Sequence, residues 1–329
     1  MLPPSPIIDR CKTDVLSPFA FLAGTKLDLF TELADDPKSA KELAAAISVD
    51  PNWLQPLLFA LVASGLLIEY EGIFRNSDEA DHYLVRGRPH FIGDVGKLFE
   101  DLWRGAFLAA ESVKAGKPLA AHNYADMSDE AVSRFFLGQH PDALLAGWKL
   151  ADAVDFTGLR NLVDVGGGSG GLALALCERY PKLRAKIMEL PAVTRVANRF
   201  IAESPVNERV VAVAADLLEK PLTGNFDVAV IRSLLQVLGP SECQQLLINV
   251  RPALSPGATL YIIGQILDDD RKHPENVALF NLIFLSFYEN GRAHTETQQR
   301  NWLQADGFID IRREVTSNGL NMMTARVPT

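Results

Sequence analysis

A glycine-rich run with an acidic residue near its start, LVDVGGGSGG, occupies residues 162–171. Gly166, Gly168 and Gly171 fit the pattern G-x-G-x-x-G, in which the backbone of a strand-to-helix turn approaches the phosphates of a dinucleotide. Asp164, however, lies near the end of the preceding strand, and ligands of open α/β sheets bind at the carboxyl ends of the strands. A pyrophosphate about 4 Å from this carboxylate would be repelled by on the order of 4 kcal/mol at an effective dielectric near 20. A ligand that carries an ammonium group would be attracted instead.

Two further acidic residues end the next two expected strands. Glu189 is placed to accept hydrogen bonds from both hydroxyls of a ribose, although dinucleotide-binding folds also carry an acid there. Asp216 can accept a hydrogen bond from the amino group of adenine while the backbone amide of Leu217 donates to the ring. Three acids at successive strand ends favour S-adenosylmethionine (SAM), a nucleoside with an amine beside a sulfonium, over a pyrophosphate ligand. The alternative is that these acids cap helices or lie in turns.

The segments that position these residues alternate between short apolar strands and helices from about residue 158 onward. The expected strands are LRNLVDVG, RAKIMEL, RVVAVAAD, FDVAVIRSLL and ATLYIIGQI. Such alternation is typical of a parallel sheet that helices cover on both faces. The last two expected strands, FIDIRREV and LNMMTARV, are joined by TSNG and must therefore pair antiparallel. The pattern predicts an α/β, Rossmann-like sheet that closes on an antiparallel C-terminal hairpin, which is not the usual dinucleotide-binding layout.

The N-terminal half is expected to be mainly helical. Ser39 and Glu42 have the spacing of a capping box, and a second helix begins near Pro51 and ends near Gly65. The following segment, LLIEYEGIFRNS, predicts two short strands that turn at EG. Helix, turn, helix and β-wing together predict a winged-helix-like domain.

A winged helix suggests DNA binding, but the charges of this one argue against it. No Lys or Arg occurs between Lys41 and Arg75, so the second helix has no cation for phosphate or guanine. The formal net charge of −9 also disfavours nucleic acid or an anionic membrane as a partner. The second helix is apolar around much of its circumference, which predicts burial. We therefore expect a scaffold or dimerisation module, and a homodimer that forms through this half.

Composition places the chain among ordinary globular proteins, with 48% hydrophobic and 22% charged residues. The three cysteines, Cys11, Cys177 and Cys243, have no metal-ligand spacing and suit a reducing compartment. No apolar run approaches the length of a membrane span. The sequence therefore predicts a cytoplasmic protein that binds no metal.

LVDVGGGSG, MELP after the second strand and AADLL after the third resemble motifs of the SAM-dependent small-molecule O-methyltransferase family. The resemblance extends over nearly the whole chain and implies a class I methyltransferase fold. It implies a helical winged-helix-like dimerisation domain (1–100), connecting helices that contribute to the acceptor pocket (101–157) and a SAM-binding methyltransferase domain (158–329). It also implies a homodimer through the N-terminal domain, in which both subunits commonly contribute walls to the pocket.

The resemblance also implies roles for individual residues. The implied cofactor-binding residues are Asp164, Gly166, Gly168, Glu189, Asp216, Leu217 and Arg232. In such enzymes the glycines approach the methionine part, the glutamate holds the ribose, the second aspartate and the leucine frame the adenine, and the basic residue lies near the cofactor. The residues expected at the acceptor pocket are Phe136, Gln139, Phe284, Phe287 and Tyr288. For the aromatic run LFNLIFLSFYE, plain core packing is the alternative.

The motifs for proton removal depart from the family pattern. After the fourth strand such enzymes usually carry a histidine that takes the proton from the acceptor hydroxyl, and this chain has Gln236 there. An amide cannot act as a general base. Before the last helix, Ala293 replaces the glutamate that orients the histidine, and His294 occupies the place of an arginine. His294 and His140 are alternative candidates for the base, although a lone histidine is more often a surface or capping residue.

Without the family histidine, proximity and in-line orientation would supply most of the catalysis, and Gln236 would hold the acceptor by hydrogen bonds. The expected function is methyl transfer from SAM to a small-molecule acceptor, with S-adenosylhomocysteine (SAH) as the product. Oxygen is the first expected acceptor atom by family resemblance, followed by sulfur or carbon. The alternative is a family member that binds SAM and catalyses another reaction or none.

Overall fold

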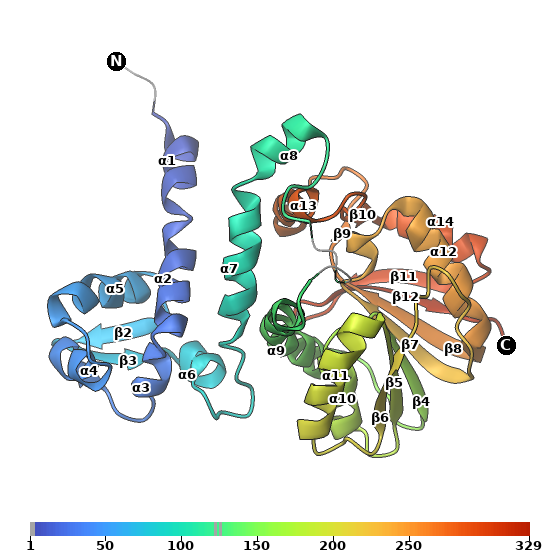
Figure 1. The fold of residues 1–329 in the computed structure, drawn as a ribbon, viewed down its shortest axis with the longest axis horizontal. Coiled ribbons are helices and arrows are strands. Elements are labelled where there is room, and N and C mark those ends of the chain that lie inside the picture. Colours follow the sequence, from blue (N-terminus) through green and yellow to red (C-terminus); the bar gives the residue numbers. More distant parts are fainter. Residues whose placement is uncertain (1–3, 122–123, 125–126) are drawn as a thin grey trace. The chain divides into compact units, whose positions relative to one another are not determined.

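The computed structural model describes residues 4–121, 124 and 127–329 of the chain. The chain forms two compact units, which divide between Glu100 and Asp101. The helices of the first unit are α1 (Pro6–Thr13), α2 (Leu16–Lys26), α3 (Leu29–Glu32), α4 (Ala40–Ala46), α5 (Pro51–Ala63) and α6 (Asp78–Leu84), and α7 (Val95–Ala106) begins in it (Figure 1). Its strands are β1 (Lys38–Ser39), β2 (Leu67–Tyr70) and β3 (Ile73–Asn76), which pair in the order β1-β3-β2.

The first unit contains the predicted helix, helix and wing. The hydroxyl of Ser39 accepts a hydrogen bond from the amide of Glu42 at 3.3 Å, and the Glu42 carboxylate accepts one from the Ser39 amide at 2.8 Å. This capping box starts α4, as predicted. Strands β2 and β3 pair antiparallel across the turn at Glu71 and Gly72, both of which have positive φ angles.

Helix α5, the second helix of the predicted winged helix, differs from the sequence prediction in its burial. Leu54, Leu58 and Leu61 are fully packed into the unit's core, but Trp53 is 85% exposed and Phe59 is 47% exposed. The helix therefore has one buried face and presents large apolar side chains on another.

The second unit alternates helices with strands. Its helices are α8 (Ala109–Ala115), α9 (Asp129–Ala153), α10 (Gly171–Arg179), α11 (Pro191–Glu203), α12 (Pro240–Val250), α13 (Glu275–Phe287) and α14 (Glu296–Ala305), with short 3-10 turns η1 (Leu235–Val237) and η2 (Arg251–Ala253). Its strands are β4 (Asn161–Val165), β5 (Arg184–Glu189), β6 (Val210–Ala214), β7 (Phe226–Arg232), β8 (Leu254–Ile263), β9 (Ile266–Leu267), β10 (His294–Thr295), β11 (Ile309–Val315) and β12 (Asn321–Arg326).

Among the described residues, seven of these strands form one sheet in the order β11-β12-β8-β7-β4-β5-β6. Strands β6, β5, β4, β7 and β8 run parallel to one another, whereas β12 runs antiparallel to both β8 and β11. The structure thus confirms the predicted Rossmann-like sheet with an antiparallel C-terminal hairpin. Because β4 lies inside the sheet, its carboxyl end is flanked by the ends of β5 and β7.

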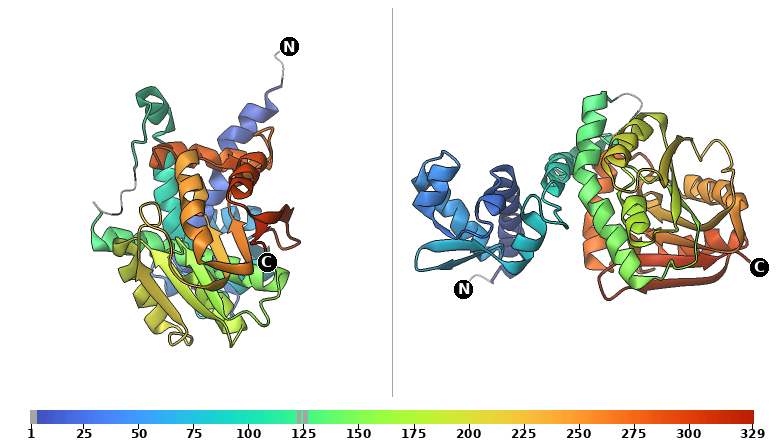
Figure 2. Two further views of the ribbon diagram at one scale, coloured as in Figure 1. Left: turned by 90° about the vertical axis from the view of Figure 1, so that its right-hand side faces the viewer. Right: turned by 90° about the horizontal axis from the view of Figure 1, so that it is seen from below.

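Helices cover both faces of this sheet, with α9, α10 and α11 on one face and α12 and α14 on the other (Figures 1 and 2). Alternate residues of β4 pack on opposite faces. Leu162 shares a buried cluster with Leu172 of α10, whereas Val163 shares a different cluster with Leu247 of α12. By the same alternation Asp164 belongs to the face that α9 and α10 cover, and its side chain is completely buried there.

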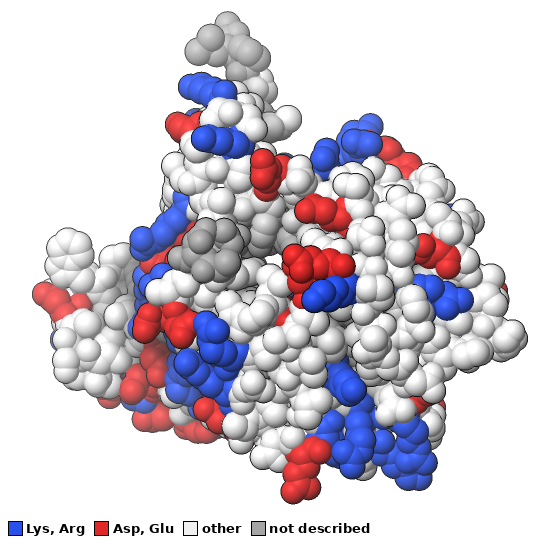
Figure 3. All heavy atoms as spheres, turned by 45° about the vertical axis from the view of Figure 1, so that its right-hand side comes forward, with Lys and Arg blue, Asp and Glu red and all other residues white. Residues whose placement is uncertain are grey.

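The surface carries both signs of charge. Asp and Glu outnumber Lys and Arg by 41 to 32, and the two kinds are interspersed on the face drawn in Figure 3. Neighbouring charges of opposite sign partly cancel each other's long-range field. Within the described ranges, every helix is too short or too polar to cross a bilayer.

Candidate active site

The glycine-rich turn between β4 and α10 depends on backbone conformations that other residues rarely adopt. Gly166, Gly168 and Gly170 have φ angles of 64°, 59° and 80°. Between them, a Cβ atom at Gly167 would lie 2.5 Å from the carboxyl carbon of Asp164. The turn therefore passes directly over the Asp164 carboxylate, which only a residue without a side chain permits.

The Asp164 carboxylate is the most unusual group at this turn. It is fully buried, and within the part of the chain that the structure describes neither carboxyl oxygen meets the geometry of a hydrogen bond, although the backbone amide of Ala173 lies close enough to lower its pKa. Burial raises its pKa to about 7, an effect that the positive charge of Arg232 opposes. A buried acceptor without a partner is costly, so a ligand that donated hydrogen bonds or positive charge here would be bound favourably.

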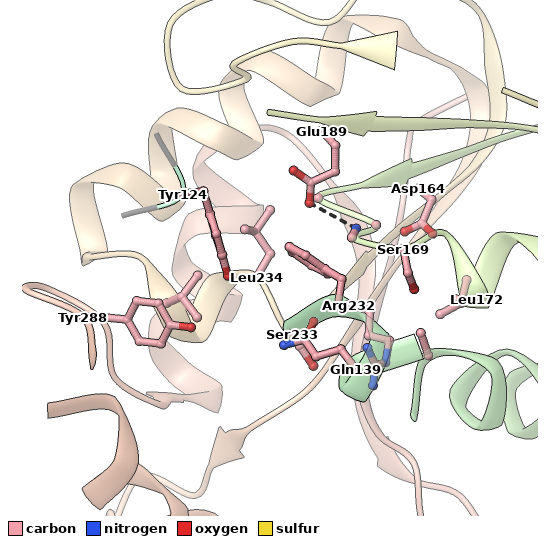
Figure 4. A pocket seen from close by; sticks show the side chains of 16 residues that line it. Tyr124, Gln139, Asp164, Ser169, Leu172, Glu189, Arg232, Ser233, Leu234 and Tyr288 are labelled. Carbon is pink, nitrogen blue, oxygen red and sulfur yellow. Dashed lines mark hydrogen bonds between the residues drawn. The ribbon is translucent and has the colours of Figure 1, made fainter. Parts of the chain in front are cut away.

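Glu189 ends β5 on the neighbouring side of the turn. Its Oε1 atom accepts a hydrogen bond from the amide of Gly168 at 3.1 Å (Figure 4). Its Oε2 atom accepts one from the amide of Leu190 at 2.7 Å. Burial raises the pKa of Glu189 to about 7 even though both amide bonds oppose the shift. The first of these bonds ties the glycine turn to the end of β5.

A cavity lies in front of the glycine turn (Figure 4). It brings together five of the predicted cofactor-binding residues, namely Asp164, Gly166, Gly168, Glu189 and Arg232. Its other lining residues include Tyr124, Phe136, Gln139, Ser169, Ser233, Leu234, Val237 and Tyr288. The cavity is thus polar toward the glycine turn and largely apolar on the side of Phe136, Leu234 and Val237.

Arg232 ends β7 and lies between two acidic residues. Burial lowers the pKa of its guanidinium, whereas the charges of Asp142 on α9 and of Asp164 raise it. Burial in turn raises the pKa of Asp142, which Arg232 opposes. Sequence patterns gave no reason to select Asp142, because it lies inside a long helix whose position against β7 only the fold determines.

The remaining predicted cofactor residues follow β6, one strand further along the same edge. The Oδ1 atom of Asp216 accepts a hydrogen bond from the amide of Leu218 at 2.9 Å, and Leu217 is buried in the core on the α12 face. Neither Asp216 nor Leu217 is among the described residues that line the cavity. Their strand position places them beyond Glu189, on the side away from Asp164.

The predicted acceptor residues divide between the cavity and the core. Phe136, Gln139 and Tyr288 line the cavity, and a Cβ atom at Gly168 would lie 2.8 Å from the Phe136 ring. Phe284 instead packs in a small core cluster with residues of β9 and α13. Phe287 lies against the backbone of α7, where a Cβ at position 105 would meet its ring at 2.2 Å.

Tyr124 and Tyr288 face each other at the apolar end of the cavity (Figure 4). The sequence gave no signal that would have selected Tyr124. Burial raises the pKa of Tyr288 to about 12 and that of Tyr124 well above its ordinary value. Both phenols therefore keep their protons at neutral pH. The two hydroxyls are hydrogen-bonded to each other, so the pair keeps one hydroxyl proton that it can donate to an acceptor molecule, and neither phenol can remove a proton from it.

The three predicted catalytic side chains make other contacts. Gln236, in η1, directs its Oε1 atom to the amide of Gln265 at 2.9 Å. His140 lies with its Nδ1 atom 2.8 Å from the hydroxyl of Ser169 and its ring stacked on Phe200 at 3.9 Å. His294 is 1% exposed. None of the three is among the described residues that line the cavity.

Comparison with known proteins identifies the family. Residues 110–309 match the O-methyltransferase domain, and residues 13–86 match the O-methyltransferase dimerisation domain. The chain belongs to the O-methyltransferase family. Its membership confirms the predicted SAM-dependent methyltransferase, the class I fold and the presence of a dimerisation domain.

Relatives of this methyltransferase match over almost its whole length. The tetracenomycin polyketide synthesis 8-O-methyl transferase TcmO of Streptomyces glaucescens is 30% identical over 316 residues, which cover 94% of this chain and 93% of the relative. The 3-hydroxy-5-methyl-1-naphthoate 3-O-methyltransferase of Streptomyces sahachiroi is 29% identical over 93% of this chain and 90% of its own. The fold also matches human N-acetylserotonin methyltransferase in complex with SAM, with a TM-score of 0.83, 22% identity and coverage of 98% and 97% of the two chains.

The described residues of this methyltransferase hold no group of three or more His, Cys, Asp or Glu side chains that could bind a metal ion. The cavity is lined by carboxylates, one guanidinium, the backbone of the glycine turn and protonated phenols. Such a set can bind a cationic nucleoside and orient a second molecule beside it.

Proposed function

We propose that this enzyme transfers the methyl group of SAM to a hydroxyl group of a small aromatic molecule. The observation that carries the proposal is the Asp164 carboxylate, which is buried, has no hydrogen-bond partner within the described residues and lines the cavity beneath the glycine turn. An ammonium group is the complement of such a site. The names of TcmO and of the naphthoate 3-O-methyltransferase, both of which denote transfer to oxygen, support oxygen as the acceptor atom.

In the proposed complex the residues along the strand ends take successive parts of the cofactor. Asp164 accepts hydrogen bonds from the ammonium group, and the guanidinium of Arg232 beside it pairs with the carboxylate of the methionine part. Gly166 and Gly168 allow the ligand to approach the backbone closely. Glu189 accepts hydrogen bonds from the ribose hydroxyls, and Asp216 with Leu217 frames the adenine.

The proposed chemistry is a single in-line displacement. The acceptor oxygen attacks the methyl carbon, the carbon–sulfur bond breaks, and its electron pair stays on sulfur to give SAH. Tyr124 and Tyr288 support this assignment because they form a hydrogen-bonded pair of protonated phenols at the apolar end of the cavity, and the pair keeps one hydroxyl proton to donate to the acceptor. The hydroxyl proton goes to water before the attack, and an acidic phenol meets this condition most easily because it is already ionised when it binds. Proximity and orientation then supply most of the rate.

Transfer to nitrogen is the second candidate. The N,N-dimethyltransferase OxyT of Streptomyces rimosus is 27% identical over 258 residues, which shows that a relative of similar sequence carries that name. A neutral amine, like an ionised phenol, needs no base before it attacks. The earlier alternatives of sulfur or carbon acceptors, or of a chain that binds SAM without transferring its methyl group, remain outcomes of the same experiment.

That experiment is turnover with a panel of acceptors. Phenols of graded acidity, aromatic amines and thiols would be incubated with SAM, and both SAH and the methylated product would be measured by mass spectrometry. The proposal expects product with the more acidic phenols and a rate that follows their ionised fraction. Product only with amines would favour nitrogen, and SAM binding without SAH release from any acceptor would contradict methyl transfer.

We also propose that the enzyme is a homodimer in the cytoplasm. The dimerisation domain supports the first statement, together with large exposed side chains in the first unit such as Trp53 and Tyr70, which are 85% and 74% exposed. Light scattering should give twice the 36.1 kDa mass of the chain at micromolar concentration, and the mass of one chain would contradict the proposal. The cysteine spacing, which indicates no disulfide framework, supports a reducing compartment.

A further inference from the structure

The turn after β7 contributes one wall of the cavity. Leu234 and Val237 both line the cavity, and a Cβ atom at Gly166 would lie 2.7 Å from the Leu234 side chain. Leu234 therefore packs directly against the glycine turn that approaches the methyl donor. A shift of this wall would move the acceptor relative to the donor.

A buried histidine holds the turn from one side. The Nε2 atom of His294 lies 3.1 Å from the carbonyl oxygen of Leu235 and 3.0 Å from that of Leu238. Because carbonyl oxygens only accept hydrogen bonds, Nε2 must carry the proton that both of them share. The ring also packs edge-on against Trp302 at 4.9 Å between centroids.

The surroundings keep His294 neutral. Its side chain is 1% exposed, and burial lowers its pKa despite the two carbonyl contacts, which raise it. Nδ1 has no hydrogen-bond partner within the described residues, so a proton placed there would be unpaired. The thiol of Cys243 donates to the same Leu235 oxygen at 3.3 Å, which satisfies that carbonyl a second time.

Two more contacts hold the turn from other directions. Gln236 accepts the 2.9 Å hydrogen bond from the amide of Gln265 just after β8. The loop that follows α13 approaches the turn so closely that a Cβ atom at Gly291 would lie 3.0 Å from the carbonyl oxygen of Gln236. This loop begins with Tyr288, which lines the cavity, so the turn and the tyrosine belong to one packed wall.

We propose that His294 is a positioning residue that fixes the acceptor-facing wall formed by Leu234, Val237 and Tyr288. It acts through the Leu235 and Leu238 carbonyls and takes no proton from the acceptor. The inference rests on the proposed methyl transfer, because it states what holds the acceptor in line. It also links two departures from the family pattern, Gln236 and His294. His294 contacts the backbone of this turn, and Gln236, which lies in the turn, contacts the backbone just after β8.

The test compares two substitutions at His294. His294→Gln keeps an N–H donor near the two carbonyls, whereas His294→Leu keeps bulk and loses the donor. With an acceptor that wild type methylates, we expect His294→Leu to lower kcat by about 10²-fold, because a small misplacement of the acceptor is that costly. His294→Gln should recover kcat to within about tenfold of wild type. All three proteins should show the same shape of pH–rate profile.

Hydrogen exchange gives a readout that needs no turnover. The amides of Val237 and Leu238 bond to the carbonyls of Leu234 and Leu235 at 3.0 and 3.2 Å, so exchange over residues 233–240 reports the turn itself. Exchange should be faster in His294→Leu than in wild type and slower in His294→Gln than in His294→Leu. Gly291→Ala, whose added Cβ atom would press on Tyr288 and on the Gln236 carbonyl oxygen, should also accelerate exchange and lower kcat. It serves as the second probe if His294→Leu does not fold.

Three results would overturn the inference. Unchanged exchange in His294→Leu would show that the histidine does not hold the turn. Faster exchange with wild-type kcat would show a structural role without consequence for the acceptor. Loss of activity in both variants together with loss of one ionisation step would make His294 the base. If wild type methylates nothing, the proposed function fails, while the exchange data still decide whether His294 holds the turn.

Discussion

The Oε1 atom of Gln236 accepts a hydrogen bond from the backbone amide of Gln265 at 2.9 Å. This contact joins the turn after β7 to the residues just after β8, at the position where enzymes of this family usually carry their catalytic histidine. The sequence led us to expect that Gln236 would hold the acceptor. The structure directs its side chain to the protein backbone instead, which favours an anchoring role.

This geometry predicts that restoring the family residue does not restore a base. In Gln236→His the imidazole would occupy a buried position beside the Gln265 amide, and the orienting glutamate is still replaced by Ala293. A positioned base typically contributes about 10²–10⁴-fold, so we expect kcat to rise by less than about tenfold. Steady-state kinetics with a phenolic acceptor would measure it, with Gln236→Ala as the control for loss of the anchor. A rise of about 10²-fold would contradict the prediction.

Asp164 supports a prediction about cofactor affinity. Asp164→Ala removes the unpartnered carboxylate and should weaken SAM binding by about 1.5–3 kcal/mol, the range for a charge-assisted hydrogen bond. Calorimetry with SAM and SAH would measure the change, and NAD should not bind to the wild type. Glu219→Gln changes an exposed carboxylate in the loop after β6 and is the matched control, which should bind SAM like wild type. Equal affinity for SAM in Asp164→Ala would contradict the assignment.

The sequence predicted the sheet, its helices and the carboxylates at the strand ends because these features repeat with the periods of strands and helices. Leu162 and Val163 alternate between two cores, and that alternation alone puts Asp164 on the α10 face. The direction of Gln236 could not be predicted, since it lies in an irregular turn whose conformation depends on distant contacts. The exposure of Trp53 was likewise missed, because apolar composition does not distinguish a core from an interface.

His140 supports a prediction about acid stability. Burial lowers its pKa to about 4, below the ordinary value of 6.5, and its ring is held neutral between Phe200 and Ser169. Between pH 6.5 and pH 4 the unfolded chain binds a proton at this site that the folded chain does not bind. The free energy of unfolding is therefore unaffected by His140 titration above pH 6.5. As the pH falls below 6.5, proton binding by the unfolded chain lowers the free energy of unfolding by up to about 1.4 kcal/mol per pH unit.

Urea unfolding between pH 4 and pH 7 would test this, with His140→Gln as the variant that cannot titrate. The free energy of unfolding of wild type should decline more steeply with acidification than that of the variant, by a slope of about one proton. Parallel curves for the two proteins would show that His140 does not titrate differently in the folded and unfolded chains.

The last prediction concerns the pH dependence of SAM binding. Without cofactor the pKa of Asp164 is about 7, raised chiefly by burial, so near neutral pH a substantial fraction of the carboxyl groups is protonated. An ammonium group beside it favours the ionised form and lowers this pKa in the complex. Binding below about pH 7 must therefore release a proton, and SAM affinity should rise with pH until the free carboxyl is ionised.

Calorimetry at pH 6.5 in two buffers of different ionisation enthalpy would count the protons released. Wild type should release a measurable fraction of a proton, and Asp164→Asn, which cannot ionise at this position, should release less. Glu189 titrates in the same range, so the difference between the two proteins, and not the total, assigns the proton to Asp164. Identical proton release by both proteins would show that the ammonium group of SAM does not depend on this carboxylate.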